Sequence, residues 1–153
     1  MSGGAAELEH GVVRRLGPGD EAIAKVLFAA MAEAFEEEHA PLSDAYVTAL
    51  LARADLWVLA AIAGDEVLGG LTAHHLPMTR AETSELFIYD LAVREAHRRR
   101  GVGRRLVEHL RALGAAAGVE AVFVPADDED EHALDFYRAI GGAGAPVTIF
   151  TFS

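Results

Sequence analysis

Six arginines surround two glycines in one short stretch of an otherwise acidic sequence. The stretch is VREAHRRRGVGRRL, residues 93–106, whereas the whole chain has 13 Lys and Arg against 24 Asp and Glu. Glycine lets backbone N–H groups approach a ligand closely, and arginine binds phosphate oxygens with paired hydrogen bonds. A helix that begins near Gly101 would add its unpaired N–H groups and its dipole. These residue types and this spacing predict a phosphate-binding loop.

Two common phosphate-binding motifs do not fit this loop. The P-loop pattern G-x-x-x-x-G-K-[ST] is absent. The dinucleotide pattern G-x-G-x-x-G fails because Leu106 stands where the third glycine belongs. The order here is R-x-x-G-x-G, at Arg98, Gly101 and Gly103. The alternative is that the stretch is only a basic, solvated start of a surface helix.

The elements expected around the loop are strands and helices in an α/β order. Apolar spacing predicts helices over 21–38, 44–53, 101–117 and 131–140. Strands are predicted over 11–16, 56–63, 66–76, 84–93, 120–126 and 147–152. Helices covering a mixed sheet are therefore expected. Residues 1–10 are predicted to be a flexible N-terminal tail, and 11–153 a single domain.

Composition narrows the classes of function. The formal net charge of −11 argues against a nucleic-acid or anionic-membrane partner and favours cationic ligands. The chain has no cysteine, so a disulfide framework, a thiolate nucleophile and a cysteine metal site are excluded. Its N-terminal sequence lacks a signal-peptide pattern, and no apolar run reaches the ~18 residues of a membrane span. A cytoplasmic protein is expected.

The arginine-glycine loop and a second motif together resemble the GNAT superfamily of N-acetyltransferases. The family loop is Q/R-x-x-G-x-G/A after a strand, matched here by Leu91-Ala92-Val93, Arg98, Gly101 and Gly103. The stretch DEHALDFYRAIGG, residues 130–142, resembles the family's N-x-x-A-x-x-F-Y-x-x-x-G-F. Asp130 and Gly142 depart from it, which leaves the local loop shape open. The resemblance implies the GNAT fold, a mixed and mostly antiparallel central sheet flanked by about four helices.

The resemblance also implies acetyl-CoA as the co-substrate, with no metal. The loop would hold the diphosphate of coenzyme A, and the end of the preceding strand would pair with the pantetheine arm. The cofactor-binding residues implied are Leu91, Ala92, Val93, Arg98, Arg99, Arg100, Gly101, Val102, Gly103, Arg104, Ala133 and Phe136.

A protonated amine must lose a proton before it can attack, so a general base is needed. Asp90 is the expected base, because it directly precedes the segment Leu91-Ala92-Val93 that the resemblance places along the pantetheine arm. The N–H of Leu91 or of a neighbour is the expected oxyanion donor. On a regular strand Phe87 and Tyr89 would face away from Asp90, but a bulge typical of the superfamily would re-aim these side chains. Tyr137 matches the family's general acid. The alternatives are that Asp90 is a structural carboxylate and that Tyr137 only packs against the cofactor. Direct transfer of the acetyl group in a ternary complex is expected.

Two acidic runs are candidates for binding the acceptor amine. They are EEE at 36–38 and DDEDE at 127–131, and either could attract a cation or be an ordinary solvated surface. The histidines at 74 and 75 are expected near the same cleft. The substrate-binding residues expected are Asp127, Asp128, Glu129, Asp130, His74, Tyr89 and Glu37.

A closer resemblance, over about residues 20–141, is to the aminoglycoside 3-N-acetyltransferases of the GNAT type. It is carried by ELFIYDLAVREAHRRRGVGRRL, VPADDEDEHALDFYRAIG and HHLP. It implies acetylation of the 3-amino group of the 2-deoxystreptamine ring, and hence antibiotic resistance. The alternatives are a GNAT enzyme for another amine, such as a polyamine or a protein N-terminus, and a non-catalytic acyl-CoA sensor. A monomer and a homodimer are both open.

Overall fold

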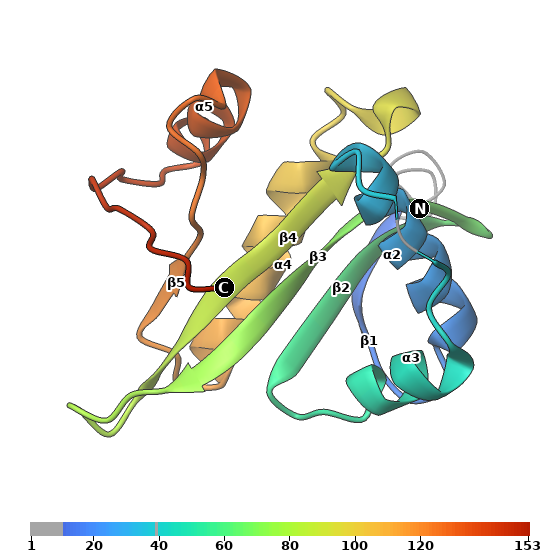
Figure 1. Ribbon diagram of the computed structural model, residues 1–153, viewed down its shortest axis with the longest axis horizontal. Helices are drawn as coiled ribbons and strands as arrows, with labels where there is room; N and C mark the ends of the chain where they lie inside the picture. Colours follow the sequence, from blue (N-terminus) through green and yellow to red (C-terminus); the bar gives the residue numbers. More distant parts are fainter. Residues whose placement is uncertain (1–10, 39) are drawn as a thin grey trace, which may run out of the picture.

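The sheet contains five strands in the order β1-β2-β3-β4-β5. Figure 1 shows the computed structural model, which describes residues 11–38 and 40–153. The strands are β1 (Val12–Leu16), β2 (Leu56–Ala63), β3 (Glu66–Pro77), β4 (Ser84–Val93) and β5 (Ala121–Phe123). Strands β1 to β4 pair antiparallel, and β5 joins β4 in parallel. The predicted mixed, mostly antiparallel sheet is confirmed, while the predicted tail at 1–10 lies outside the described residues.

Helices cover both faces of this sheet. They are α2 (Glu21–Ala34), α3 (Asp44–Leu51), α4 (Val102–Ala116) and α5 (Glu131–Ala139), with a short 3-10 helix η1 (Glu95–His97). On one face Leu27 of α2 and Val47 of α3 are fully buried in one apolar cluster. On the other face Leu106 and Leu110 of α4 are fully buried in a second cluster. The described residues contain no helix long and apolar enough to span a bilayer.

The first helix is shorter than the apolar spacing predicts. It ends at Ala34 instead of residue 38, because the Glu37 amide donates to the Ala32 carbonyl at 2.9 Å and closes the last turn. Glu36 takes a left-handed backbone with φ 55°. The acidic run 36–38 therefore lies in a turn after the helix, and the prediction of helix there is wrong.

The two C-terminal strand predictions also need correction. Strand β5 covers only Ala121–Phe123 instead of 120–126. Residues 147–152 are not a strand at all, because no neighbouring strand pairs with them in the described part of the chain. Strand-forming residues become a strand only when another backbone supplies the hydrogen bonds.

Candidate active site

A β-bulge in β4 decides which side chains share a face with Asp90. Thr72 of β3 pairs with Asp90, and the next residue, Ala73, pairs with Ile88. Tyr89 is thus the extra residue that the bulge inserts into β4. Before the bulge Leu86 and Ile88 face the α4 cluster, and after it Ala92 faces the α2 cluster. The bulge expected in this strand is confirmed.

The bulge gathers an aromatic group beside Asp90, on the face that α2 covers. His74 pairs across the strands with Phe87, so both lie on the face of Asp90. Tyr89 packs edge-on against both rings, with centroids 5.6 Å from His74 and 6.0 Å from Phe87. Phe123 of β5 extends the row, with its ring 5.0 Å from Phe87. The group offers an exposed aromatic surface, since Tyr89 is 63 % exposed.

The neighbouring histidine lies on the opposite face. His75 Nε2 is 2.7 Å from Ser84 Oγ, and its ring packs 5.3 Å from Trp57 in the α4 cluster. Adjacent residues of a strand point to opposite sides. The structure therefore brings His74, and not His75, to the face of Asp90.

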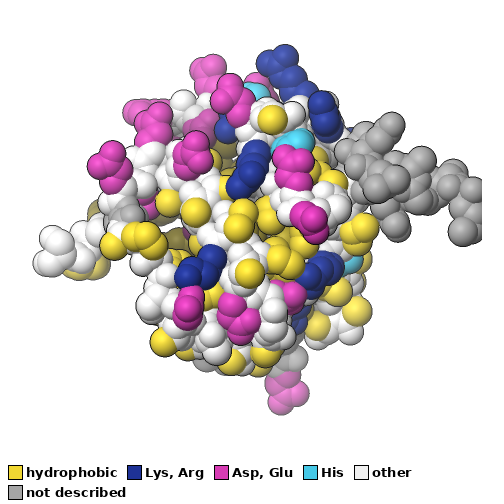
Figure 2. Space-filling view, turned by 90° about the vertical axis from the view of Figure 1, so that its right-hand side faces the viewer, with side chains coloured by type: hydrophobic (Ala, Val, Ile, Leu, Met, Phe, Trp, Pro, Cys, Tyr) yellow, Lys and Arg dark blue, Asp and Glu magenta, His cyan; other side chains and the backbone are white. Residues whose placement is uncertain are grey.

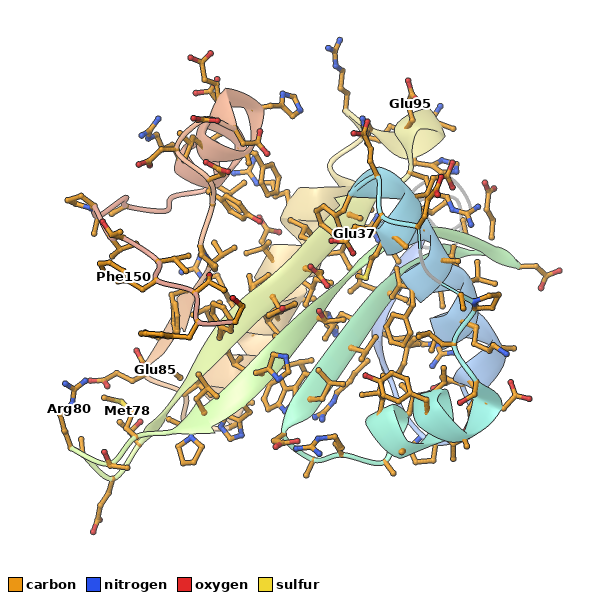
Figure 3. All side chains as sticks on the ribbon, in the orientation of Figure 1. Glu37, Met78, Arg80, Glu85, Glu95 and Phe150 are labelled. Carbon is orange, nitrogen blue, oxygen red and sulfur yellow. The ribbon has the colours of Figure 1, made fainter. Side chains whose placement is uncertain are left out.

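The environment of Asp90 makes its carboxylate more basic. Burial raises the pKa of Asp90, the nearby carboxylate of Glu37 raises it further, and His74 opposes these effects. Figure 3 shows Glu37 at the upper end of β4, beside the end of α2. The Asp90 carboxylate accepts no hydrogen bond from another described residue, so its lone pairs are available. A half-buried carboxylate with a raised pKa suits proton removal near neutral pH.

The arginine-glycine loop leaves backbone N–H groups at the start of α4 open to a ligand. Arg99 and Gly101 both have left-handed backbones, with φ 63° and 76°. Gly101 precedes α4 with no side-chain cap, and the first turn of α4 has no acidic residue. A Cβ placed at Gly101 would meet nothing within 4 Å. The first N–H groups of α4 are therefore open to an anion.

The arginines of this loop differ in what they contact. Arg98 donates through Nε to the Val93 carbonyl at 3.2 Å, which ties the loop to the end of β4. Arg104 pairs with Glu108 one turn along α4, at 3.1 Å. Arg99 and Arg100 are exposed and form no ion pair with another described residue. These two guanidinium groups are the ones most available to a phosphate.

Anchors on neighbouring elements hold the loop in place. His97 Nε2 lies 2.7 Å from Glu66 Oε1 at the start of β3, and the Arg94 amide donates to the Leu68 carbonyl at 2.9 Å. Glu66 and His97 are 31 residues apart in sequence. This pair was not predicted, because nothing in the sequence relates two ordinary polar residues so far apart.

Gly103 has a packing role that the sequence did not indicate. A Cβ at Gly103 would meet the Phe136 ring at 3.0 Å and a Val93 methyl at 3.7 Å. Because Gly103 has no side chain, the Phe136 ring can pack against it, and this contact joins α5 to the start of α4. Gly103 fixes helix packing here, and Gly101 is the glycine that faces open space.

Tyr137 follows Phe136 on α5 and is half-buried. Burial and the nearby Asp130 carboxylate raise the pKa of Tyr137 to about 12. The hydroxyl therefore keeps its proton at neutral pH, as a general acid must. Its ring lies 5.1 Å from that of Phe136, so the contact of Phe136 with Gly103 also positions Tyr137. Ala133, one turn earlier on the same helix, is half-buried.

The outer edge of β4 is unpaired beside Asp90. Strand β5 pairs with β4 only over Glu85–Phe87, and the two chain directions part beyond that point, as Figure 1 shows. No strand in the described chain pairs with the outer edge of Ile88–Val93. The Val93 carbonyl is already occupied by Arg98, and the other backbone groups of Leu91–Val93 that point to this edge can serve a ligand.

The acidic turn before α5 uses part of its charge for its own structure. Asp127 Oδ1 accepts from the Glu129 amide at 3.1 Å. Asp130 Oδ1 caps α5 by accepting from the Ala133 amide at 3.0 Å, so aspartate fills the capping place of the family's asparagine. Asp128 and Glu129 are exposed, and their carboxylates contact no other described residue. These two are the free anions of the turn.

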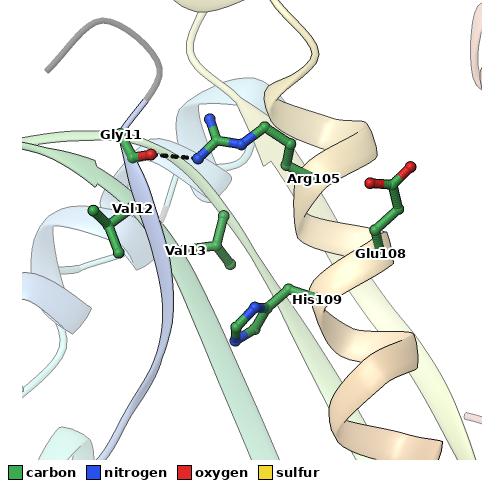
Figure 4. Close-up of a pocket in the computed structure, with 6 residues that line it drawn as sticks. All are labelled: Gly11, Val12, Val13, Arg105, Glu108 and His109. Carbon is green, nitrogen blue, oxygen red and sulfur yellow. Dashed lines mark hydrogen bonds between the residues drawn. The ribbon is translucent and has the colours of Figure 1, made fainter. Parts of the chain in front are cut away.

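Surface charge elsewhere is mixed. Figure 2 shows the face that carries α2 and α3, where acidic side chains gather toward the upper left and basic ones stand apart. An open pocket of about 440 Å³ lies between β1 and α4 (Figure 4). It is lined by Gly11, Val12, Val13, Arg105, Glu108 and His109. None of the predicted site residues lines it, so it is separate from the site around Asp90.

Phe87 and Phe123 also belong to the face of Asp90, although they were not predicted as site residues. The available signal was the bulge, which places Phe87 and Asp90 on one face although they are three residues apart. Without the exact position of the bulge, the regular alternation of side chains along a strand placed Phe87 on the side opposite Asp90. Phe123 needs the β4–β5 register as well, and that register has no signal in a single sequence.

Comparison with known proteins gives a consistent result. The Acetyltransferase (GNAT) family profile matches residues 21–141. A search of curated proteins found no match. The crystal structure of the aminoglycoside acetyltransferase HMB0005, from an uncultured soil metagenomic sample, is 38 % identical, with a TM-score of 0.86. The match covers 93 % of this chain and 97 % of that one.

A second aminoglycoside acetyltransferase, meta-AAC0020, also from an uncultured soil metagenomic sample, is similar in structure. Its trehalose complex is 30 % identical with a TM-score of 0.90, covering 93 % of this chain and 95 % of that one. It has also been crystallised with sisomicin. A ribosomal-protein-alanine N-acetyltransferase from Brucella melitensis shares the fold at 19 % identity, with a TM-score of 0.75 and coverage of 92 % and 99 %. The chain belongs to the Acetyltransferase (GNAT) family.

Proposed function

We propose that this acetyltransferase moves the acetyl group of acetyl-CoA to an amine of an aminoglycoside, at the 3-amino group of the 2-deoxystreptamine ring. The observation that carries the proposal is the acidic and aromatic face around Asp90. It places Glu37, His74 and Tyr89 beside a carboxylate of raised pKa. Such a face suits a polyhydroxylated ring that bears ammonium groups. The similarity to two aminoglycoside acetyltransferases supports the same class of acceptor.

The donor side of the site fits coenzyme A. Arg99, Arg100 and the N–H groups around Gly101 would bind the diphosphate, and the unpaired edge of Leu91–Val93 would bind the pantetheine arm. Arg98 fixes the loop through the Val93 carbonyl. Arg104, Val102, Ala133 and Phe136 would shape the surroundings of the cofactor.

The transfer would then proceed in one ternary complex. Asp90 takes a proton from the acceptor ammonium, and the amine nitrogen attacks the thioester carbonyl carbon. A backbone N–H near Leu91 stabilises the charge on the carbonyl oxygen. The C–N bond forms, the nitrogen releases its second proton to water, the C–S bond breaks, and the leaving thiolate takes the proton of Tyr137, which then regains one from water. The protonated state of Tyr137 at neutral pH supports this role.

Loss of the 3-ammonium charge would weaken drug binding to ribosomal RNA, and resistance would follow. The experiment measures release of coenzyme A from acetyl-CoA with a panel of gentamicin-like drugs, spermidine and an N-terminal peptide. We expect turnover with the drugs and an NMR spectrum showing acetylation at the 3-amino group. Turnover with spermidine or the peptide and none with the drugs would reject the acceptor. No turnover with any amine would reject the whole proposal.

A further inference from the structure

One residue of the arginine-glycine loop turns inward, and it is a histidine. Every other residue from Arg94 to Gly101 is exposed, whereas the His97 side chain keeps only 14 % of its surface exposed. His97 ends the short helix η1, and its amide donates to the Arg94 carbonyl at 2.8 Å. Figure 3 labels Glu95 on this helix, near the end of β4. The imidazole is therefore the side chain by which the loop contacts the body of the protein.

The partner of this imidazole lies on a tight hairpin elsewhere in the chain. His97 Nε2 donates to Glu66 Oε1 at 2.7 Å. Glu66 begins β3 directly after the two-residue turn Gly64-Asp65 and pairs across that turn with Ala63. Gly64 has a φ of 61°, as a hairpin turn of this length requires. The hairpin leaves the Glu66 backbone little freedom, so its carboxylate is a fixed point for the loop.

This contact is the main link between the loop and the rest of the sheet. The backbone pairing of β4 with β3 continues only to Arg94, whose amide donates to the Leu68 carbonyl at 2.9 Å. The other side-chain bond of the loop, from Arg98 Nε to the Val93 carbonyl, returns to the end of β4 itself. In the described chain, His97 to Glu66 is thus the hydrogen bond by which residues 95–100 reach an element other than β4.

The segment that follows His97 has few bonds of its own. The backbone N–H groups of Arg99 and Arg100 donate to no described residue. Arg99 nevertheless holds a left-handed backbone, with φ 63°, and a non-glycine residue keeps such a backbone only where the surroundings enforce it. The shape of residues 98–101 therefore depends on how the two ends of the segment are held, by His97 on one side and by α4 on the other.

We propose that His97 and Glu66 are positioning residues for the donor, and that their contact sets the affinity for acetyl-CoA without touching it. The inference rests on the proposed binding of the coenzyme A diphosphate by this loop. Glu66 is an anion and cannot itself attract a phosphate, and the Nε2 of His97 is occupied by Glu66. The contact keeps Arg99, Arg100 and the N–H groups after Gly101 in place before the ligand arrives. Without it the ligand must order the loop on binding, which lowers affinity.

Calorimetric binding of acetyl-CoA tests the proposal and needs no acceptor amine. His97→Phe keeps a ring in the inward position but removes the donor. The dissociation constant should rise about 2- to 12-fold, the effect of one hydrogen bond. Glu66→Ala removes the acceptor at a side chain that is 56 % exposed, where folding tolerates the change, and should have the same effect. The double variant should bind no more weakly than either single one, because both lose the same contact.

A conservative variant and a matched control separate positioning from general stability. His97→Gln places an amide N–H near the position of Nε2 and should restore most of the affinity. Arg53→Gln breaks an exposed ion pair with Asp55, 2.8 Å long, between α3 and β2 at the opposite end of the sheet from η1 (Figure 1). It should bind acetyl-CoA like the wild type, with stability compared by urea unfolding. An equal loss of affinity in Arg53→Gln would overturn the proposal.

The variant Arg99→Ala/Arg100→Ala separates this inference from the proposed function. If it weakens acetyl-CoA binding while Glu66→Ala and His97→Phe leave binding unchanged, the loop holds the diphosphate and the positioning role is wrong. If the double arginine variant also binds normally, or if the wild type binds no acetyl-CoA, the proposed donor site is rejected and this inference with it. Weaker binding in all three variants, with recovery in His97→Gln, is the expected result.

Discussion

The arginine-glycine loop and the acidic turn before α5 are oppositely charged, and they use their charges differently. In the loop, Arg99 and Arg100 have no ion-pair partner among the described residues, and the backbone is left-handed at Arg99 and Gly101. In the turn, Asp127 and Asp130 each accept a hydrogen bond from a nearby amide. Two arginines of the loop are therefore open to a ligand, whereas two of the four carboxylates at residues 127–130 stabilise the turn itself.

The difference shows why a count of charges is a poor measure of a binding site. A carboxylate that caps a helix still carries its charge, but its position is fixed by the helix and one oxygen is already occupied. Backbone strain at a non-glycine residue such as Arg99 costs about 1–3 kcal/mol, and persists only where the surroundings hold it. Three variants, ordered by expected effect, test this difference between the two regions.

The largest effect is expected at Asp90. Asp90→Asn should lower kcat/KM by roughly 10²–10⁴-fold, the usual range for a general base, while binding of acetyl-CoA by calorimetry stays unchanged. In the wild type, activity should fall as the pH falls through the pKa of Asp90. Because that pKa is raised, the decline should begin at a higher pH than for an ordinary aspartate. Full activity of the variant from pH 6 to 9 would contradict the assignment.

The next effect compares the two glycines that flank α4, Gly101 before its start and Gly118 after its end. Gly101 and Gly118 have φ of 76° and 77°, and neither has an atom within 4 Å of a Cβ. Valine at either position should cost similar stability, checked by urea unfolding. Only Gly101→Val should raise the KM for acetyl-CoA. Loss of one charge-assisted hydrogen bond, about 1.5–3 kcal/mol, corresponds to about 10- to 150-fold. Equal KM values for the two variants would argue against the loop as the diphosphate site.

The smallest effect is expected at the free anions of the acidic turn. Asp128→Asn/Glu129→Gln removes two charges without touching the capping bonds, so stability should not change. At about 0.2–1 kcal/mol for each exposed pair, the KM for a gentamicin-like drug should rise roughly 2- to 30-fold and depend less on salt. Asp65→Asn/Glu21→Gln removes the same charge elsewhere and controls for net charge. Identical drug KM and salt response in both double variants would show that the turn is only a solvated surface.

Much of the fold was predictable because apolar periodicity is local. The strands at 56–63 and 84–93 have the predicted bounds, and the helix predicted from residue 44 begins there, where Ser43 accepts a capping bond from the Tyr46 amide. The wrong predictions concern segments whose structure depends on hydrogen bonds that the local sequence pattern does not reveal. Residues 147–152 have the side chains of a strand but no neighbouring backbone, and α2 ends early because backbone hydrogen bonds close its last turn at Glu37.

The sequence alone predicted the arginine-glycine loop, the aromatic pair Phe136 and Tyr137, and Asp90 as candidate site residues, because each lies in a short motif whose spacing is visible in one dimension. Which neighbours meet these residues depends on the tertiary structure. The bulge at Tyr89 put Phe87, His74 and Asp90 on one face, and the close fit of Phe136 on Gly103 connected α5 to α4. Those contacts depend on strand register and helix packing between distant segments, and a single sequence does not record either of them.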